Sequence, residues 1–123
     1  MTVLVAPLGA IQFLTRIPIR LRSAPDLAAC VPWFPVVGGA IGAMVGLVVA
    51  GLMEVVPPLV AAAVGIVFGV VLTGAFHEDG LADTADALGG WDPEQRREIL
   101  KDSRHGSYGV AAMCSTIVIR TVC

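Results

Sequence analysis

Charged side chains are scarce in this chain of 123 residues: they make up 15% of it, against 56% hydrophobic residues. A soluble domain typically carries ~25% charged residues, so this composition excludes an ordinary water-exposed surface. The few charges are gathered in short stretches, and the rest of the chain is nearly free of them. Together with a mean hydropathy of +0.82, this pattern is typical of a protein that crosses a lipid bilayer several times.

Three further absences narrow the class of protein. The three cysteines, Cys30, Cys114 and Cys123, form no CxxC pair, so the sequence predicts neither a disulfide framework nor a zinc site. The net charge of −2 lacks the basic footprint of general nucleic-acid binding, so we expect no nucleic-acid partner. No basic region precedes the first apolar stretch and no clear cleavage motif follows it, so we expect no secretory signal peptide.

Two long apolar runs predict a hairpin of transmembrane helices. Residues 36–56 are long enough to cross a bilayer core, which takes ~20 apolar residues. Residues 59–76 form a second run after Pro57 and Pro58, which end the first helix. Small residues recur at every fourth position of both runs, which predicts close helix packing. They are Gly38, Gly42, Gly46 and Ala50 in the first run and Ala61, Gly65, Gly69 and Thr73 in the second.

The segments around this hairpin predict its orientation. Basic residues cluster at 16–22 and at 96–104. Two crossings return the chain to its starting side, so the positive-inside rule places both clusters, and the acidic stretch after the hairpin, in the cytoplasm. We interpret residues 1–15 as an interfacial or re-entrant helix and residues 24–35 as irregular. The apolar run 108–119 is too short to cross, so we expect a single membrane domain that is the N-terminal fragment of a longer protein and inactive alone.

The predicted fold class is therefore all-α: a polytopic transmembrane helical protein with a two-span hairpin, cytoplasmic amphipathic helices and the start of a further span. Gly89 and Gly90 end an acidic helix. Asp92 as N-cap, with Pro93 and Gln95 after it, predicts the start of the next helix. Residues 106–109 are predicted to form a turn.

The densest group of charges follows the second apolar run, at residues 77–86. Asp79, Asp83 and Asp86 stand at i, i+4 and i+7, so they share one face of a helix. Three like charges on adjacent turns repel, and we expect a divalent cation to compensate them. Mg²⁺ prefers carboxylate oxygens and often completes its shell with substrate phosphates. The basic, serine- and glycine-rich residues 101–109 suit such a diphosphate; the alternative is a solvated charged loop between two spans.

Four segments resemble the cobalamin synthase family, the adenosylcobinamide-GDP ribazoletransferases: Phe13–Pro18, Trp33–Gly38, His77–Asp86 and Lys101–Gly109. The resemblance covers the whole chain, although the family is substantially longer. It implies an Mg²⁺-dependent, multi-pass enzyme of the bacterial inner membrane. Such an enzyme joins α-ribazole, or its phosphate, to adenosylcobinamide-GDP and releases GMP. Other enzymes of the cobalamin pathway are possible partners on this resemblance.

On this mechanism we expect two sets of site residues. Asp79, Asp83 and Asp86 would hold the metal, with Glu78 as a fourth ligand or a neighbour of the ligands. One of these carboxylates could accept the proton of the attacking hydroxyl. The residues expected at the substrate phosphates, with Lys101 also among the catalytic residues, are Lys101, Asp102, Ser103, Arg104, Gly106 and Ser107. His105 stands where the family more often has an apolar residue, and no role is predicted for it.

Two other interpretations remain open. The run Asp79-Gly80-x-Ala82-Asp83 faintly resembles the CDP-alcohol phosphotransferases, another class of membrane transferase, but their downstream Gly-x-x-x-Asp-x-x-x-Asp pattern is missing from this sequence. The second is a non-catalytic membrane scaffold or a channel subunit that gathers cations at an acidic vestibule. That interpretation predicts ion binding without nucleotide binding.

Overall fold

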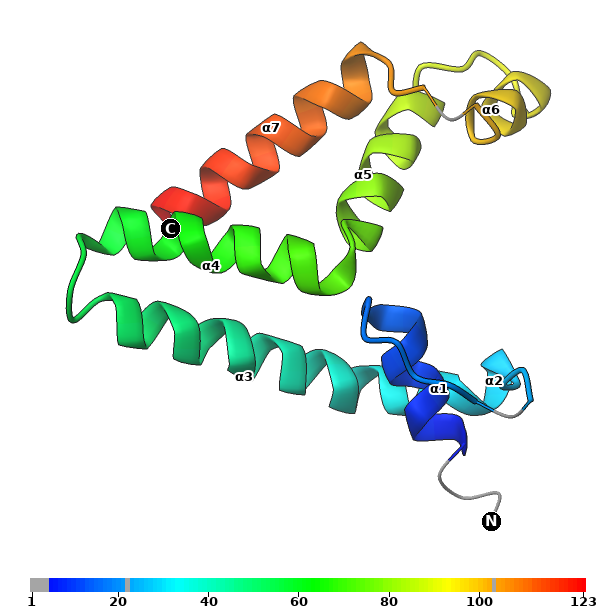
Figure 1. The fold of residues 1–123 in the computed structure, drawn as a ribbon. Helices are drawn as coiled ribbons and strands as arrows, with labels where there is room; N and C mark the ends of the chain where they lie inside the picture. Colours follow the sequence, from blue (N-terminus) through cyan, green and yellow to red (C-terminus); the bar gives the residue numbers. More distant parts are fainter. Residues whose placement is uncertain (1–4, 22, 103) are drawn as a thin grey trace. The chain divides into compact units, whose positions relative to one another are not determined.

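The computed structural model describes residues 5–21, 23–102 and 104–123, and every regular element within these ranges is a helix (Figure 1). The all-α prediction is therefore confirmed. The chain divides into two compact units, Met1–Gly74 and Ala75–Cys123, which we call unit 1 and unit 2.

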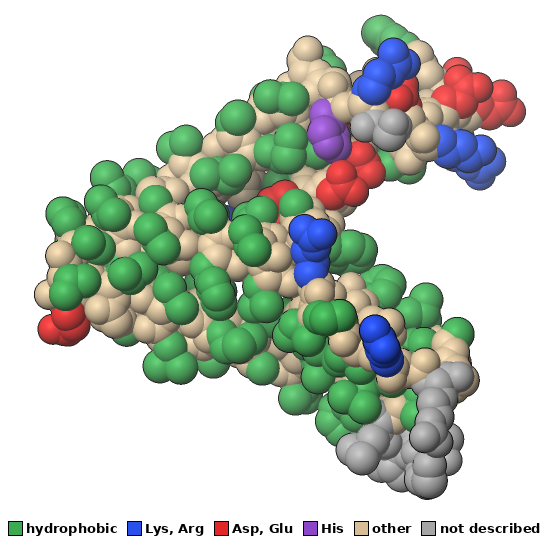
Figure 2. All heavy atoms as spheres, in the orientation of Figure 1, with side chains coloured by type: hydrophobic (Ala, Val, Ile, Leu, Met, Phe, Trp, Pro, Cys, Tyr) green, Lys and Arg blue, Asp and Glu red, His purple; other side chains and the backbone are tan. Residues whose placement is uncertain are grey.

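Unit 1 is dominated by one long helix formed from three contiguous pieces, α2 (Leu27–Cys30), the 3₁₀ turn η1 (Val31–Trp33) and α3 (Phe34–Leu52). These pieces form a continuous helix of 26 residues, Leu27–Leu52. In the described part of the chain, no other single helix is both long enough and apolar enough to cross a membrane. Large hydrophobic side chains on it are exposed, and Figure 2 shows such side chains over the α3–α4 region.

The prediction that residues 24–35 are irregular was wrong for residues 27–35, which are helical. Pro32 and Pro35 lie in the first turns of η1 and α3, where a proline removes only an N–H that has no intrahelical acceptor. The Asp26 carboxylate caps the start by accepting the N–H of Ala28 at 3.0 Å. Proline therefore shapes the entry to this helix without breaking it.

Helix α4 (Pro58–Thr73) packs along α3 through its small residues. Ala61 and Gly65 are buried. A Cβ added to Gly69 would lie 3.4 Å from Val45 Cγ2, and one added to Gly65 would overlap the Val49 side chain. The two helices are antiparallel, because Gly65 faces Val49 whereas Gly69, one turn later on α4, faces Val45, one turn earlier on α3 (Figure 1). The predicted hairpin packing is confirmed for this ridge.

The ridge on α3 does not take part in that packing. A Cβ added to Gly38, Gly42 or Gly46 would meet no heavy atom of the described residues within 4 Å. These three glycines lie on a face of α3 turned away from α4. The prediction that both ridges pack was therefore wrong for α3 within unit 1.

The second apolar helix is shorter than the predicted 59–76. It ends at Thr73 because Gly74 and Ala75 both adopt the left-handed conformation, with φ values of 69° and 61°. At 1.5 Å per residue, its 16 residues span about 24 Å, less than the ~30 Å of a bilayer's hydrocarbon core. The Arg16 N–H donates to the Leu72 carbonyl at 2.8 Å and ties the segment after α1 (Val5–Leu14) to this end.

Unit 2 consists of α5 (Phe76–Ala87), α6 (Pro93–Ile99) and α7 (Ser107–Val122), with α5 and α7 packed against each other. The predicted N-cap of α6 is confirmed, because Asp92 accepts the Gln95 N–H at 2.8 Å. The Gln95 side chain accepts the Trp91 N–H at 2.7 Å, one residue before the N–H that a capping box would use. The predicted turn at 106–109 was wrong, since Ser107 opens α7 and Gly106 is its N-cap.

Candidate functional site

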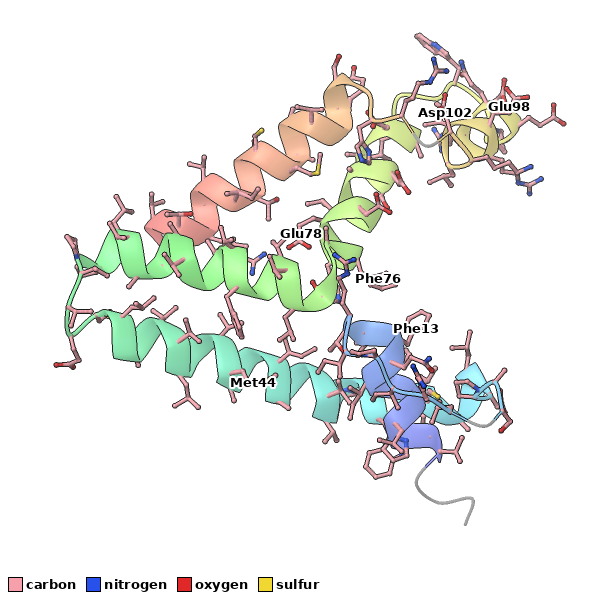
Figure 3. The ribbon with its side chains drawn as sticks, viewed as in Figure 1. Phe13, Met44, Phe76, Glu78, Glu98 and Asp102 are labelled. Carbon is pink, nitrogen blue, oxygen red and sulfur yellow. The ribbon has the colours of Figure 1, made fainter. Side chains whose placement is uncertain are left out.

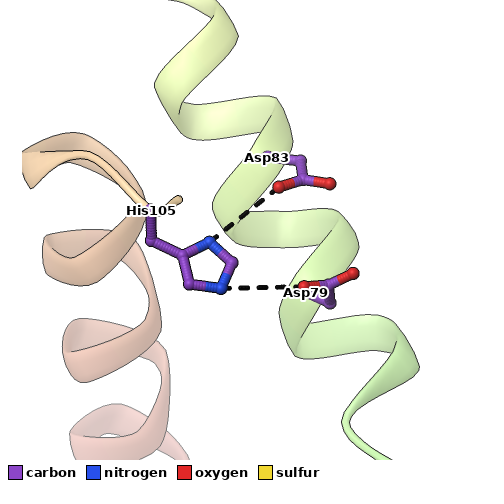
Figure 4. Close-up of side chains that lie close together, drawn as sticks. All are labelled: Asp79, Asp83 and His105. Carbon is purple, nitrogen blue, oxygen red and sulfur yellow. Dashed lines mark ion pairs between the residues drawn. The ribbon is translucent and has the colours of Figure 1, made fainter. Parts of the chain in front are cut away.

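Three side chains of unit 2 converge at one place (Figure 4). Asp79 and Asp83 lie one turn apart on α5, and His105 comes from the loop before α7. His105 Nε2 lies 3.7 Å from Asp79 Oδ1, and His105 Nδ1 lies 3.9 Å from Asp83 Oδ1. Each residue offers a ligand atom within 4.8 Å of the others. We call these three residues the Asp–Asp–His cluster.

The donor set of this cluster fits a divalent cation. Mg²⁺ is commonly held by one or two carboxylates and completes its shell with water and substrate phosphates. The side chains of Asp79, Asp83 and His105 remain 64%, 34% and 35% exposed, so such additional ligands have access. The donor types of the cluster and its exposure are therefore compatible with a Mg²⁺ ion that also binds water or phosphate.

Asp86, the third aspartate of the predicted stripe, is engaged elsewhere. Its carboxylate accepts the N–H of Gly106 at 2.7 Å and the N–H of Gly109 at 2.8 Å. A Cβ added to Gly106 would lie 2.6 Å from Asp86 Oδ1, and one added to Gly109 would overlap the same carboxylate. The two glycines thus permit the close approach by which Asp86 caps the N-terminus of α7.

Glu78 also lies outside the Asp–Asp–His cluster. Glu78 lies at the start of α5 (Figure 3). Its Oε1 pairs with Arg120 Nη1 at 3.2 Å, which links the start of α5 to the end of α7. The side chain is only 15% exposed, and Oε2 is buried without a hydrogen-bond partner among the described residues. Helix α7 continues through Arg120 to Val122, beyond the end of the apolar run at residue 119.

The basic segment lines a cavity of about 610 Å³ in unit 2. Four of the predicted substrate-binding residues contribute to its wall, Asp102, Arg104, Gly106 and Ser107, together with His105 and Asp86. Lys101 is exposed just after α6. Ser103 lies outside the described residues. The cavity therefore adjoins the Asp–Asp–His cluster through His105, which belongs to both.

Arg104 and Asp102, which both line this cavity, form an ion pair. Arg104 Nη2 donates to Asp102 Oδ2 at 2.8 Å, and Arg104 Nε donates to Oδ1 at 3.1 Å. Hydrogen bonds from the Arg104 side chain and backbone lower the pKa of Asp102 from 3.8 to about 2, and the carboxylate in turn raises the pKa of Arg104. The guanidinium, although 87% exposed, therefore stays protonated beside the cavity.

His105 is the residue that sequence reasoning missed. It lies within residues 101–109, which the analysis singled out for their basic and glycine content. What brings it onto Asp79 and Asp83 is the reversal of the chain between α5 and α7, and no spacing along the sequence encodes that distance. The one indication was the presence of a metal-binding residue type beside a predicted phosphate segment.

Comparison with known proteins places these observations in a family. The sequence model described as cobalamin-5-phosphate synthase matches residues 6–123. Proteins named adenosylcobinamide-GDP ribazoletransferase are similar to the chain: that of Albidiferax ferrireducens is 44% identical over 124 residues, and that of Shewanella piezotolerans is 42% identical over 115. Each alignment covers 90% of this chain and 44% of the relative, so the chain spans less than half of their length. No solved structure matches the chain.

Proposed function

The chain belongs to the cobalamin-5-phosphate synthase family, and on that basis we propose that it carries the metal- and diphosphate-binding part of an adenosylcobinamide-GDP ribazoletransferase. The reaction would join α-ribazole, or its phosphate, to adenosylcobinamide-GDP and release GMP. One observation carries the proposal beyond the names of the relatives. The Asp–Asp–His cluster adjoins a cavity of about 610 Å³ whose wall holds an arginine and the N-terminus of a helix.

Asp79 and Asp83 are the residues we propose as ligands of Mg²⁺. When bound, the ion would neutralise negative charge on the diphosphate and help to hold it in place. The sequence prediction also names Asp86 and Glu78 as ligands. Their carboxylates already contact the backbone N–H groups of α7 and the Arg120 side chain, so we propose for them the task of placing α7 against α5.

The remaining residues of unit 2 would bind and orient the substrate. Arg104, which is paired with Asp102 on one side, would neutralise phosphate oxygens, and Ser107 would donate a hydrogen bond to them. Lys101 would add positive charge from the rim. In the reaction, the ribazole hydroxyl oxygen bonds to the phosphorus on the cobinamide side, and the bond to the GMP oxygen breaks. A carboxylate oxygen of Asp79 or Asp83 would accept the hydroxyl proton.

We further propose that the protein is a multi-pass protein of the bacterial inner membrane, with unit 2 on the cytoplasmic side. The support is the 26-residue apolar helix, the hairpin of α3 and α4, and basic residues on both sides of that hairpin. Cysteines introduced at Ala24 and Glu94 should be protected from impermeant maleimide in intact cells. Labelling of either position from outside would contradict a two-span hairpin.

The activity itself is tested by GMP release from adenosylcobinamide-GDP and α-ribazole in membranes that contain the full-length protein, with and without EDTA. We expect EDTA to stop the reaction and Asp83→Asn to slow it by orders of magnitude, because the metal and positioning supply most of the acceleration. Glu94→Gln, which changes an exposed carboxylate on α6, is the matched control and should retain the rate. Activity that is indifferent to EDTA would contradict the metal, and absence of GMP release would contradict the transferase.

A further inference from the structure

We propose that His105 is a nitrogen ligand of the cation held by Asp79 and Asp83, and that it makes this site prefer Mn²⁺ to Mg²⁺. The inference rests on the cation site of the proposed function and adds a ligand that the sequence did not predict. The resulting set of two carboxylates and one imidazole differs from an all-oxygen Mg²⁺ site.

The spacing of the three side chains leaves room for an ion. The nitrogen-to-oxygen distances of 3.7 and 3.9 Å exceed those of hydrogen bonds, which reach about 3.2 Å. Two ligand atoms each about 2.1 Å from a metal lie roughly 3.0 to 4.2 Å apart, depending on the angle between them. An imidazole binds an ion through one nitrogen, so each of the two distances describes a separate pair, and both exceed a direct imidazole–carboxylate hydrogen bond. One ring nitrogen and one oxygen from each aspartate lie within 4.8 Å of one another, which is the spacing that bears on a shared ion.

The two ring nitrogens face different carboxylates, which suits a metal-bound histidine. A ligating histidine commonly donates its other N–H to a carboxylate, and this contact fixes the ring orientation. Here one nitrogen can bind the ion together with one aspartate, while the other faces the second aspartate (Figure 4). The ring thus has a carboxylate facing each nitrogen, and one oxygen of each aspartate lies within 4.8 Å of the nitrogen that would bind the ion.

The backbone on both sides of His105 is fixed by other contacts. On one side, the Gly106 N–H is held by Asp86 at 2.7 Å. On the other, the Arg104 N–H donates to Asp102 at 3.1 Å. These contacts fix the backbone of the loop from which His105 reaches the two aspartates of α5. His105 also lines the cavity, so an ion bound to it would be accessible to phosphate oxygens there.

Imidazole nitrogen discriminates between the two cations. It is a good ligand for first-row transition ions, whereas Mg²⁺ favours oxygen donors and readily keeps water in their place. Replacing His105 should therefore weaken Mn²⁺ binding much more than Mg²⁺ binding. This difference distinguishes a ligand from a residue that only shapes the loop, because a distorted loop would weaken both ions together.

The test is Mn²⁺ binding to the protein in detergent, followed by electron paramagnetic resonance, with Mg²⁺ as competitor. We expect the Mn²⁺ spin-echo spectrum of the wild type to show coupling to ¹⁴N. His105→Val and His105→Gln should both lose that coupling and bind Mn²⁺ at least about tenfold more weakly, while Mg²⁺ binding changes by less than about threefold. His77→Ala removes the other of the two histidines, which is exposed on α5, and should behave as the wild type.

Persistence of the ¹⁴N coupling in both His105 variants would overturn the inference, as would equal Mn²⁺ affinities or absence of Mn²⁺ binding to the wild type. Failure of the transferase proposal has a different signature. If EDTA-sensitive GMP release depends on Asp83 while Mn²⁺ shows no nitrogen ligand, the proposed function stands and the role of His105 is wrong. If the nitrogen ligand is found but no GMP is released, the opposite holds.

Discussion

Asp86 offers the sharpest test of how unit 2 is held together. Its carboxylate accepts two backbone N–H groups, those of Gly106 and Gly109, at the N-terminus of α7. Replacing Asp86 by alanine removes both acceptors, and replacing it by asparagine removes the charge and turns an NH₂ group toward one of the two donors. Both changes should loosen the start of α7 even in the absence of any metal.

The size of the effect follows from the burial of the two donors. Gly106 is exposed, so water can replace Asp86 there at little cost. Gly109 is buried, and a buried N–H left without an acceptor costs about 1–3 kcal/mol. Loss of a negative charge at the helix N-terminus adds about 0.3–1 kcal/mol. We therefore expect Asp86→Ala to destabilise the start of α7 by about 2–3 kcal/mol.

Amide hydrogen exchange measures this change directly. In the presence of EDTA, a loss of about 2–3 kcal/mol should speed exchange at the Gly109 N–H by roughly 30- to 150-fold, since ~1.4 kcal/mol corresponds to a factor of ten. Asp83→Asn is the matched control, one turn earlier on the same helix and outside the α7 cap. It should leave Gly109 unchanged.

Two results would refute this reasoning. Exchange at Gly109 that changes by less than about twofold in Asp86→Ala would mean that the cap contributes little to local stability. Equal acceleration in Asp83→Asn would mean that the charge of α5 as a whole, rather than these two hydrogen bonds, holds α7. An Asp86 that acts only as a metal ligand predicts no change at all in EDTA.

Three further predictions concern other contacts. Gly65→Leu should destabilise the α3–α4 hairpin by about 1–3 kcal/mol through overpacking against α3. Gly42→Leu should be nearly neutral, because a side chain there meets no neighbour among the described residues. The free energies of unfolding of the two variants can be compared in mixed detergent micelles. The pKa of Asp102 in the folded protein lies below its ordinary value of 3.8, so the ion pair with Arg104 should be fully formed above pH 3.8 and be lost as the pH falls through about 2. An NMR titration of the Asp102 carboxyl carbon with a midpoint near 3.8 would contradict the pairing. Arg120→Leu should reduce the stability of unit 2 more than the double change with Glu78→Leu, because it leaves a buried carboxylate unpaired.

Local signals in the sequence predicted the local structure well. The N-cap at Asp92 acts through a hydrogen bond between near neighbours, and the structure reproduces it. The small-residue spacing on α4 indicated a packing surface because such a ridge admits a neighbouring helix wherever that helix lies. The same spacing on α3 gave a wrong expectation within unit 1, since a ridge indicates that close approach is feasible and does not say which helix uses it.

Contacts between distant segments could not be read from spacing. The i, i+4, i+7 register correctly placed Asp79, Asp83 and Asp86 along one helix, but their separate partners come from α7 and the loop before it. Asp86 lies 20 residues before Gly106 and 23 before Gly109. Only the antiparallel return of α7 along α5 decides which carboxylate meets a backbone N–H and which meets an imidazole. His105 was missed for the same reason.

The partners of α5 also change the argument that first suggested a metal. Neighbouring like charges on one helix require compensation, and the sequence offered a cation as the means. In the structure, Glu78 is compensated by Arg120 and Asp86 by the N-terminus of α7. Asp79 and Asp83 remain, with His105 facing both. Charge repulsion therefore supports one ion at two carboxylates rather than a cage of four, and Asp79→Asn and Asp83→Asn should weaken cation binding while Glu78→Gln should act on stability alone.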